Sequence, residues 1–403
     1  MWQRTLEPLI AQGKVHVVGV VQEQHPARTR LYTQWRQFKW PILVDSLNLL
    51  DVDVVPVVIG LDESGVVRST RLSPRNLAAE FIEKEFPPAS SATEYARAEP
   101  PDPVERRAHA ERTSTPVAWR DAADALFLHG EPSDLDQAVT AYENAVSRDP
   151  QDARARFRLG VALRRRSETP MRQPGDAQGA VDQWTEALAV NPNQYIWRRR
   201  LQQYGPRLDK PYNFYFWVGT ARSDILARGE TPFDLPVEPS GSELAPPAKA
   251  PNGSATAERV NTDPDGRITR DLHRLVRIDT VVTPAAVKPG ARVRARIDLR
   301  LPNVPHPWWN NEAKDLVTWV DLPEGFELGE GSLSYPNPAE PETREDRAVE
   351  FDVVTAEGGR PGVFHLPGYA LYYVCEDKGG KCRYLRQDFT FKVVVDTSAP
   401  TLK

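Results

Sequence analysis

The chain has few of the residues that bind metals or act as nucleophiles: two cysteines, two methionines and seven histidines among 403 residues. The histidines are scattered and form no cluster with the cysteines at the spacing of a zinc site, so no metal is expected. No apolar run approaches eighteen residues, so the sequence predicts no membrane-spanning helix. The first residues also lack the charged-then-apolar pattern of a signal peptide.

Sequence motifs for nucleotide and hydrolase chemistry are missing as well. There is no P-loop and no Gly-x-Gly-x-x-Gly loop to cradle phosphates, and no Gly-x-Ser-x-Gly elbow. Acidic and basic residues are well mixed, 56 of the first and 51 of the second, and the sequence pI is near 5.9. These features argue against a nucleic-acid surface, a kinase and a hydrolase, and no cofactor is expected.

Proline, by contrast, is abundant, and its 37 residues cluster where we expect the joints between domains. A chain of this length is expected to hold two to four domains. We predict a multidomain protein with an α/β module, an all-α helical domain and an all-β sandwich. The predicted boundaries are 1–86 for the α/β module, 87–116 for a proline-rich linker without regular structure, 117–229 for the helical domain, 230–265 for a second linker and 266–397 for the sandwich.

The two cysteines, Cys375 and Cys382, flank a polar connection that contains Gly379-Gly380, and aromatic and β-branched runs lie on both sides. This composition predicts a β-hairpin with a tight turn at the glycines. With the two arms in register, the cysteines are cross-strand neighbours, close enough for a disulfide. Two interpretations remain open: a structural bond or a pair of buried thiols, and a redox-active pair that undergoes thiol–disulfide exchange.

The first 86 residues alternate helical and strand patterns. Pro56 stands in an apolar run, where proline belongs at a strand start, at an edge or in a cis turn. Ser73-Pro74 has the N-cap and first-turn residues of a helix. Strands are predicted at 15–21, 41–45, 54–61 and 66–70, and helices at 2–12, 29–40 and 73–86.

This order of elements resembles the thioredoxin/redoxin fold, in which a cis-proline at the position of Pro56 faces an active-site dithiol. The family's first strand and its Cys-x-x-Cys do not occur in the sequence, which begins Met1-Trp-Gln-Arg, inside the family's first helix. The resemblance therefore implies a truncated module that cannot carry out dithiol chemistry as written. Either the module is redox-inactive, or the missing strand and motif lie upstream of Met1.

The helical segment contains a repeat of small and aromatic residues, each copy followed by a proline. The two copies lie 42 positions apart, with Leu159-Gly160 before the second. The pattern resembles the tetratricopeptide repeat, whose period is 34, and implies a scaffold that recruits protein partners. The residues are Ala138, Tyr142, Ala145 and Pro150 in the first copy, and Ala180, Trp184, Ala187 and Pro192 in the second.

Two arginine triplets, 164–166 and 198–200, lie on these helices. They predict either a basic face that binds a carboxylate or an acidic peptide, or an ordinary solvated helix face. The candidate partner-binding residues are Arg164, Arg165, Arg166, Arg198, Arg199 and Arg200.

From residue 266 the sequence alternates with period two, which predicts strands over 272–283, 292–300, 316–321 and 348–354 and in both arms of the cysteine hairpin. Lys288-Pro-Gly290 is a turn. Six strands at this spacing favour a β-sandwich. The segment His306-Pro-Trp-Trp-Asn-Asn-Glu312 is unusual in its adjacent tryptophans, which either cover a pocket or pack on the end of the sandwich.

The aromatic strand that ends at Cys375, the acidic and glycine-containing turn, Cys382 and the following Tyr384 resemble the N-terminal domain of the thiol:disulfide interchange protein DsbD. In that family the two cysteines pass reducing equivalents to thioredoxin-like partners. The resemblance implies that Cys375 and Cys382 are the exchanging pair. Six residues separate them here, and the family usually has five.

Together these patterns predict a thiol–disulfide-linked protein outside the cytoplasm, in the periplasm, whose helical repeats recruit protein partners, among them a thioredoxin-like protein. The alternative is a non-enzymatic interaction scaffold with a redox-inactive thioredoxin fold and a structural disulfide. As written, the chain leans toward the non-enzymatic class. An upstream Cys-x-x-Cys would make the longer protein an oxidoreductase.

Overall fold

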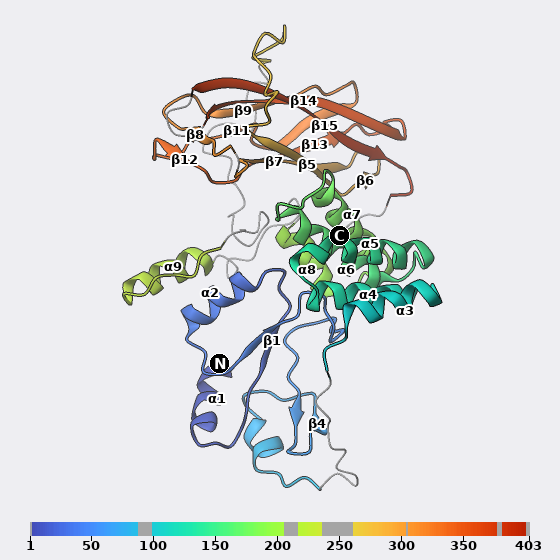
Figure 1. Ribbon diagram of the computed structural model, residues 1–403, viewed down its shortest axis with the longest axis vertical. Helices are drawn as coiled ribbons and strands as arrows, with labels where there is room; N and C mark the ends of the chain where they lie inside the picture. Colours follow the sequence, from blue (N-terminus) through green and yellow to red (C-terminus); the bar gives the residue numbers. More distant parts are fainter. Residues whose placement is uncertain are drawn as a thin grey trace. The chain divides into compact units, whose positions relative to one another are not determined.

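The computed structural model describes residues 2–87, 99–204, 217–235, 261–303, 305–376 and 381–399, and it combines helices with an all-β C-terminal region (Figure 1). The chain divides into two compact units. The first consists of Met1–Arg165, Val190–Arg200 and Trp217–Glu238, and the second of Arg166–Ala189, Leu201–Phe216 and Pro239–Lys403. None of the described helices is both long enough and apolar enough to cross a membrane.

The N-terminal part of the first unit contains two small sheets. A parallel pair is formed by β1 (Gly19–Val21) and β2 (Ile42–Val44), and an antiparallel pair by β3 (Gly60–Leu61) and β4 (Val67–Ser69). The strands predicted at 15–21 and 54–61 are wrong over most of their length, since β1 and β3 cover only their last residues and Val18 and Ile59 are 58% and 52% exposed. Each of these two described sheets has only two strands. A strand in so small a sheet has too few neighbours for both of its faces to be buried.

Two helices precede β1 and β2: α1 (Trp2–Ala11) and α2 (Pro26–Arg36). The helix predicted over 73–86 is reduced to one π-helical turn, η1 (Ala78–Ile82). The Asn76 side chain accepts hydrogen bonds from both the backbone N–H and the hydroxyl of Ser73. The Ser73 N–H bond is of the kind found in a capping box, and the Leu77 N–H donates to the Ser73 carbonyl at 3.0 Å, so a first turn begins at Ser73 but does not continue as an α-helix.

The prediction that residues 87–116 lack regular structure is wrong for α3 (Pro103–Thr113). Pro103 occupies the first turn, where a missing N–H costs no hydrogen bond, and the Asp102 carboxylate accepts from the N–H of Val104 at 2.8 Å. Proline thus starts this helix instead of preventing it. Ala110 of α3 is buried against alanines of the next helix, α4 (Pro116–His129).

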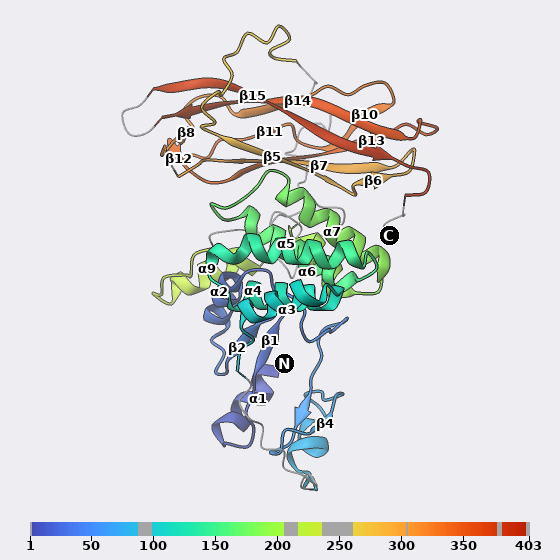
Figure 2. The ribbon, with the colours of Figure 1, turned by 45° about the vertical axis from the view of Figure 1, so that its right-hand side comes forward.

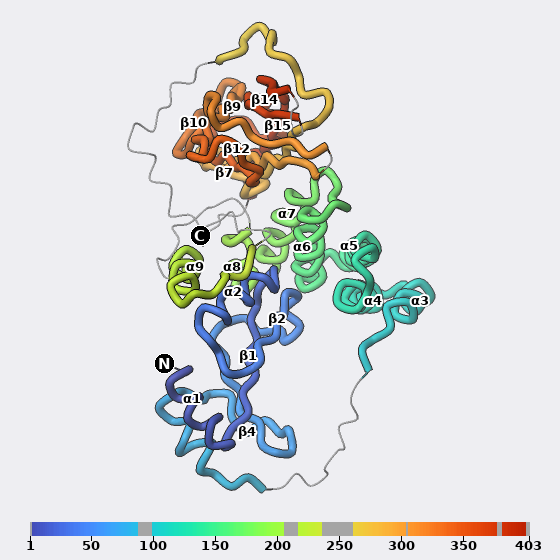
Figure 3. Tube along the Cα trace, turned by 60° about the vertical axis from the view of Figure 1, so that its left-hand side comes forward, coloured from blue at the N-terminus to red at the C-terminus, as the bar shows by residue number. Residues whose placement is uncertain are grey.

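The helices α3, α4 and α5 lie side by side in the first unit (Figure 3). A buried polar network joins α4, α5 and α6: the Tyr142 hydroxyl donates to Asp124 at 2.6 Å, and Arg158 pairs with the same carboxylate at 2.5 Å. Burial raises the pKa of Asp124, and Arg158 opposes the shift. The remaining helical elements are η2 (Pro132–Asp134), α5 (Leu135–Arg148), α6 (Ala153–Ser167), α7 (Asp176–Val190), α8 (Tyr195–Tyr204) and α9 (Trp217–Ala227).

The two copies of the sequence repeat fall on α5 and α7. All six small and aromatic residues of the repeat are buried, and the two prolines follow the helices. The 3-4 spacing places them on one helix face, so their burial confirms that this face of each helix packs against protein. The buried residues are Ala138, Tyr142, Ala145, Ala180, Trp184 and Ala187.

The C-terminal region forms two sheets of the second unit, drawn as two layers of strands in Figure 2. One has the order β10-β13-β7-β5, and the other β11-β9-β14-β15-β6, with β8 pairing β14 and β12. Both sheets contribute to one buried apolar core that includes Ile297, Phe351 and Phe391. The strands are β5 (Arg277–Thr283), β6 (Ala286–Val287), β7 (Arg292–Arg300), β8 (Trp308–Asn310), β9 (Leu316–Val320), β10 (Phe326–Gly331), β11 (Ser334–Tyr335), β12 (Glu342–Thr343), β13 (Arg347–Thr355), β14 (Gly362–Cys375) and β15 (Cys382–Val395).

Candidate functional site at the cysteine hairpin

The longest strand pair of the C-terminal region, β14 with β15, ends at the two cysteines. The antiparallel register runs without interruption from Gly362↔Val395 to Cys375↔Cys382. A disulfide joins the cysteines, whose Cα atoms are 3.8 Å apart. The prediction that they are cross-strand neighbours close enough to bond is therefore confirmed, and the glycine turn predicted at 379–380 lies outside the described residues.

The two cysteines differ in their access to solvent. Cys375 is completely buried, whereas Cys382 is exposed. The sheet explains the burial, because Cys375 has a neighbour on each side: Cys382 on β15 and Trp308 on β8. Cys382 begins β15 and lies at the end of the hairpin. Only one of the two residues is therefore positioned to meet a second protein.

Aromatic and charged side chains surround the pair. The rings of Tyr373 and Tyr384 are stacked across the hairpin, with centroids 4.4 Å apart. Glu376 forms an ion pair with Arg383 at 2.8 Å, and its backbone N–H donates to the carbonyl of Lys381. Glu376 thus neutralises Arg383, and Lys381, which directly precedes Cys382, is exposed.

The adjacent tryptophans of the 306–312 segment lie beside the disulfide because β8 pairs with the end of β14. Trp309 is fully buried, its indole N–H donates to the Glu345 carbonyl at 2.9 Å, and its ring meets Tyr372 edge to face. Trp308 is partly exposed and lies opposite Cys375. Trp309 thus packs in the core, and Trp308 borders the cysteine pair.

A buried arginine, which no sequence motif marks, supports this corner of the sheet. The Arg347 guanidinium lies over the rings of Trp309 and Tyr335, 4.4 and 5.1 Å from their centroids. It donates to Glu345 at 2.8 Å and to Asn337 at 3.0 Å. Burial lowers the pKa of Arg347, and the Glu345 carboxylate opposes the shift. These contacts fix the orientation of Trp309 and hence of β8 beside Cys375.

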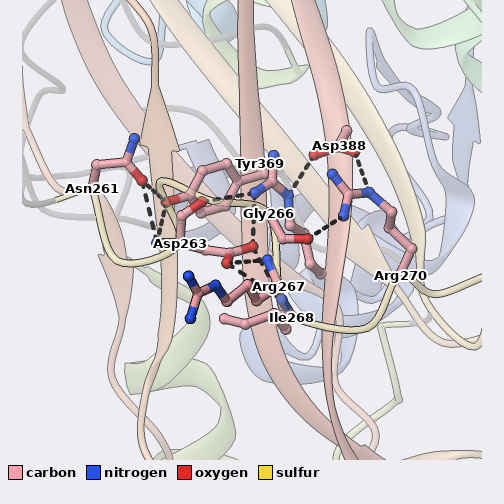
Figure 4. A network of polar contacts seen from close by, with 9 residues as sticks. Asn261, Asp263, Gly266, Arg267, Ile268, Arg270, Tyr369 and Asp388 are labelled. Carbon is pink, nitrogen blue, oxygen red and sulfur yellow. Dashed lines mark hydrogen bonds and ion pairs between the residues drawn. The ribbon is translucent and has the colours of Figure 1, made fainter.

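Residues 263–271 lie beside β15 and are tied to it (Figure 4). The backbone N–H of Arg386 donates to the Thr269 carbonyl, and the Arg386 carbonyl accepts from the N–H of Asp271. Arg386 lies four residues after Cys382. The prediction of a strand from Leu272 is wrong before Arg277, because the Asp271 carboxylate instead accepts from the N–H groups of Leu275 and Val276. This segment covers part of the outer edge of β15.

Figure 4 shows the polar contacts that hold the segment in place. Asp263 pairs with Arg386 at 2.7 Å, and the Arg386 guanidinium lies 3.9 Å from the ring centroid of Tyr369. The Tyr369 hydroxyl donates to Asn261 and accepts from the N–H of Asp263. Burial raises the pKa of Asp263, but hydrogen bonds from Arg386 and from backbone N–H groups outweigh it, so the pKa lies below its ordinary value.

We expect the Asp263→Asn substitution to lower the midpoint of thermal unfolding by about 2–4 °C at pH 7. A carboxylate with a lowered pKa stabilises the fold above its unfolded pKa, and this contribution is lost as the pH falls through the folded pKa. The difference between the two proteins should therefore shrink below about pH 4. Thermal unfolding followed by circular dichroism from pH 7 to pH 3 measures it, with the exposed Asp265→Asn as the control.

The other predicted site residues belong mainly to the first unit. The Val55–Pro56 peptide bond is cis, whereas both cysteines belong to the second unit. The six arginines do not form one exposed basic face, since only Arg165 and Arg198 are exposed. Arg166 is buried in a two-fold contact with Asp176, and Arg200 is buried and donates to Gln24 at 2.5 Å. The buried arginines are Arg164, Arg166, Arg199 and Arg200.

These observations define a mixed helix-and-sheet protein with a disulfide-bonded β-hairpin. No protein-family model and no curated protein sequence matches the chain. Among solved structures it is similar to a protein of unknown function from Porphyromonas gingivalis W83, at 13% identity over 32% of this chain and 51% of that chain, with a TM-score of 0.18.

A second similar structure is the seventh ScaB type I cohesin from Pseudobacteroides cellulosolvens, at 14% identity over 31% of this chain and 96% of that chain, with a TM-score of 0.20. A third is the alpha-2-macroglobulin of E. coli, at 14% identity over 30% of this chain and 7% of that chain, with a TM-score of 0.19. The chain thus spans about half of the Porphyromonas protein and a small part of the macroglobulin.

Proposed function

We propose that the protein exchanges disulfides with other proteins outside the cytoplasm, through Cys375 and Cys382. The observation that carries the proposal is the asymmetry of the pair: Cys382 is exposed at the end of the hairpin, and Cys375 is buried behind it. Exchange requires one accessible sulfur for the partner and a second one that leaves or resolves. An oxidising compartment, such as the periplasm, is where a protein disulfide persists.

The proposed reaction consists of two successive thiol–disulfide exchange steps. A partner thiolate attacks Sγ of Cys382, which breaks the Cys375–Cys382 bond, forms a mixed disulfide and releases the Cys375 thiolate, which takes up a proton. A second thiolate of the partner then attacks the partner's own sulfur in the mixed disulfide, which forms the partner's disulfide and releases the Cys382 thiolate, and this thiolate takes up a proton. The partner dithiol has lost two electrons and two protons, and the cysteine pair has gained them. The same steps run in reverse when the partner is the oxidant.

The proposal extends to the parts of the chain. We assign residues 117–229 to a tetratricopeptide-type helical domain that recruits the partner, which the burial of Ala138, Tyr142, Ala180 and Trp184 supports. The first 86 residues are a thioredoxin-like module without its dithiol, and the all-β region is a β-sandwich like the N-terminal domain of DsbD. A thioredoxin-like protein is the partner that this assignment implies.

The alternative is a non-enzymatic interaction scaffold in which the disulfide only stabilises the hairpin. The long uninterrupted ladder of β14 and β15 favours it, because a cysteine pair at its end extends an already ordered structure. The two cysteines are seven positions apart, and closing so short a loop contributes about 2.5 kcal/mol at most in the chain-entropy account. A stabilisation of this size is ordinary for a structural disulfide, so the reduction potential has to separate the two functions.

The reduction potential of the pair separates the two functions. We expect a value near roughly −200 mV for an exchanging pair, and a value below about −300 mV would contradict exchange and favour the structural bond. The full chain is equilibrated with glutathione or dithiothreitol buffers, and its free thiols are alkylated and counted by mass spectrometry. The Cys375→Ser/Cys382→Ser variant provides the baseline for alkylation of other groups.

A further inference from the structure

A pocket of about 370 Å³ lies in the second unit, at the end of β15 opposite to Cys382. One wall is helix α7 and the others are β5 and the C-terminal half of β15. Its lining includes Gln178 and Asp182 on α7, Ile278 and Thr280 on β5, and Lys392 on β15.

The β5 wall is the outer strand of its sheet, since β7 is its only strand partner in that sheet among the residues that the structure describes. At Val282 the Gln178 side chain replaces a neighbouring strand. Its carbonyl oxygen accepts from the Val282 N–H at 2.8 Å, and its amide donates to the Val282 carbonyl at 3.1 Å. The side-chain amide of Gln178 thus makes the same two hydrogen bonds that the backbone of a neighbouring strand would make.

Alternate residues of a strand present their backbone groups to the same edge. Because the N–H and carbonyl of Val282 face Gln178, those of Thr280 and Ile278 face the same side, where the pocket lies. Among the described residues no strand pairs with this edge. The pocket therefore offers backbone donors and acceptors in the spacing that an extended peptide requires.

The charge on the α7 wall is negative on balance. The Asp182 carboxylate accepts from Gln178 at 2.7 Å and is half-buried. Burial raises the pKa of Asp182, Glu186 adds to the shift, and Lys392 opposes it. The other lining carboxylate, Asp279, is 3.9 Å from Arg172, which balances its charge. A positively charged group that binds beside Asp182 would be stabilised by the negative charge of this wall.

We propose that this pocket binds an extended peptide segment of a partner protein, whose backbone pairs with the edge of β5 at Ile278–Thr280 and whose basic side chain meets Asp182. The Gln178 amide ends the groove and sets where the added strand stops. The site does not depend on the cysteine pair, so it can be tested whether or not Cys375 and Cys382 exchange.

The test uses a fluorescein-labelled hexapeptide of alternating valine and threonine with one central lysine, titrated with the full oxidised chain and followed by fluorescence anisotropy. We expect saturable binding that is lost when the backbone of the peptide is N-methylated, because the ladder bonds are then blocked. A peptide with glutamate in place of lysine should bind at least about threefold more weakly.

Two variants of the protein should shift the affinity in opposite directions. Asp182→Asn should weaken binding of the lysine peptide about threefold to tenfold, and Lys392→Gln should strengthen it by a similar factor. Glu327→Gln, on the exposed face of the other outer strand β10, is the matched control and should change nothing. Absence of binding, binding that survives N-methylation, or equal affinities in the two variants would overturn the proposal. None of these results depends on the reduction potential.

Discussion

Reduced Cys375→Ser protein is expected to form a mixed disulfide with oxidised glutathione rapidly, and reduced Cys382→Ser protein on the order of a hundredfold more slowly. The two rates differ because glutathione can reach only one of the two cysteines in the folded protein. Cys382 is exposed at the end of the hairpin, whereas Cys375 is buried between two strands. A thiolate that cannot reach the disulfide sulfur cannot attack it. Each variant retains one thiol, so the product is a stable adduct that intact mass spectrometry counts over time.

The double variant Cys375→Ser/Cys382→Ser is the control and should form no adduct. Repeating the reaction in a denaturant measures the intrinsic reactivity of each thiol, which should be nearly equal in the two single variants. Equal rates in the native proteins, or a faster reaction at Cys375, would contradict the proposed order of attack. A thioredoxin with a single active-site cysteine, offered as its activated mixed disulfide, then tests the protein partner class directly.

Trp309→Ala is expected to lower the free energy of unfolding by about 3–5 kcal/mol, the usual cost of emptying a fully buried aromatic site. The substitution removes the ring that packs on Tyr372 and lies under the Arg347 guanidinium, and it removes the indole N–H bond to Glu345. Urea unfolding followed by circular dichroism measures the change. The fold of the variant is checked by the same spectrum without denaturant.

The neighbouring Trp308→Ala is the matched control. Because Trp308 is partly exposed, this substitution should lower the free energy of unfolding by only about 1 kcal/mol. Its effect should instead appear at the disulfide, which it borders on the side of Cys375. We expect faster reduction by dithiothreitol in Trp308→Ala than in the unsubstituted chain. A larger stability loss at Trp308 than at Trp309 would show that the burial of the two rings has been assigned the wrong way round.

Local patterns in the sequence determined much of the secondary structure. The 3-4 spacing of Ala138, Tyr142 and Ala145 follows from the helical period, and all three are buried on α5. The aromatic and β-branched arms around Cys375 and Cys382 form the predicted hairpin. In both cases the residues that specify the element lie within a few positions of one another, so the chain itself carries the information.

The sequence predicted less well those features that depend on residues far apart in the chain. The apolar runs around Val18 and Ile59 form only short strands, because a strand also needs partners that the run cannot specify. Pro103 starts α3 because Asp102 caps the helix. The arginine triplets are split between solvent and interior, since consecutive residues point to different sides of a helix and the packing around them decides which side is buried.

The candidate site divides in the same way. By itself the sequence determined that Cys375 and Cys382 face each other across a hairpin, because strand alternation and the short connection leave them opposite. Only the tertiary structure decided that Cys375 is the buried member and Cys382 the exposed one. That difference comes from β8, which pairs with one edge of β14 and places Trp308 against Cys375, a contact between segments more than sixty residues apart.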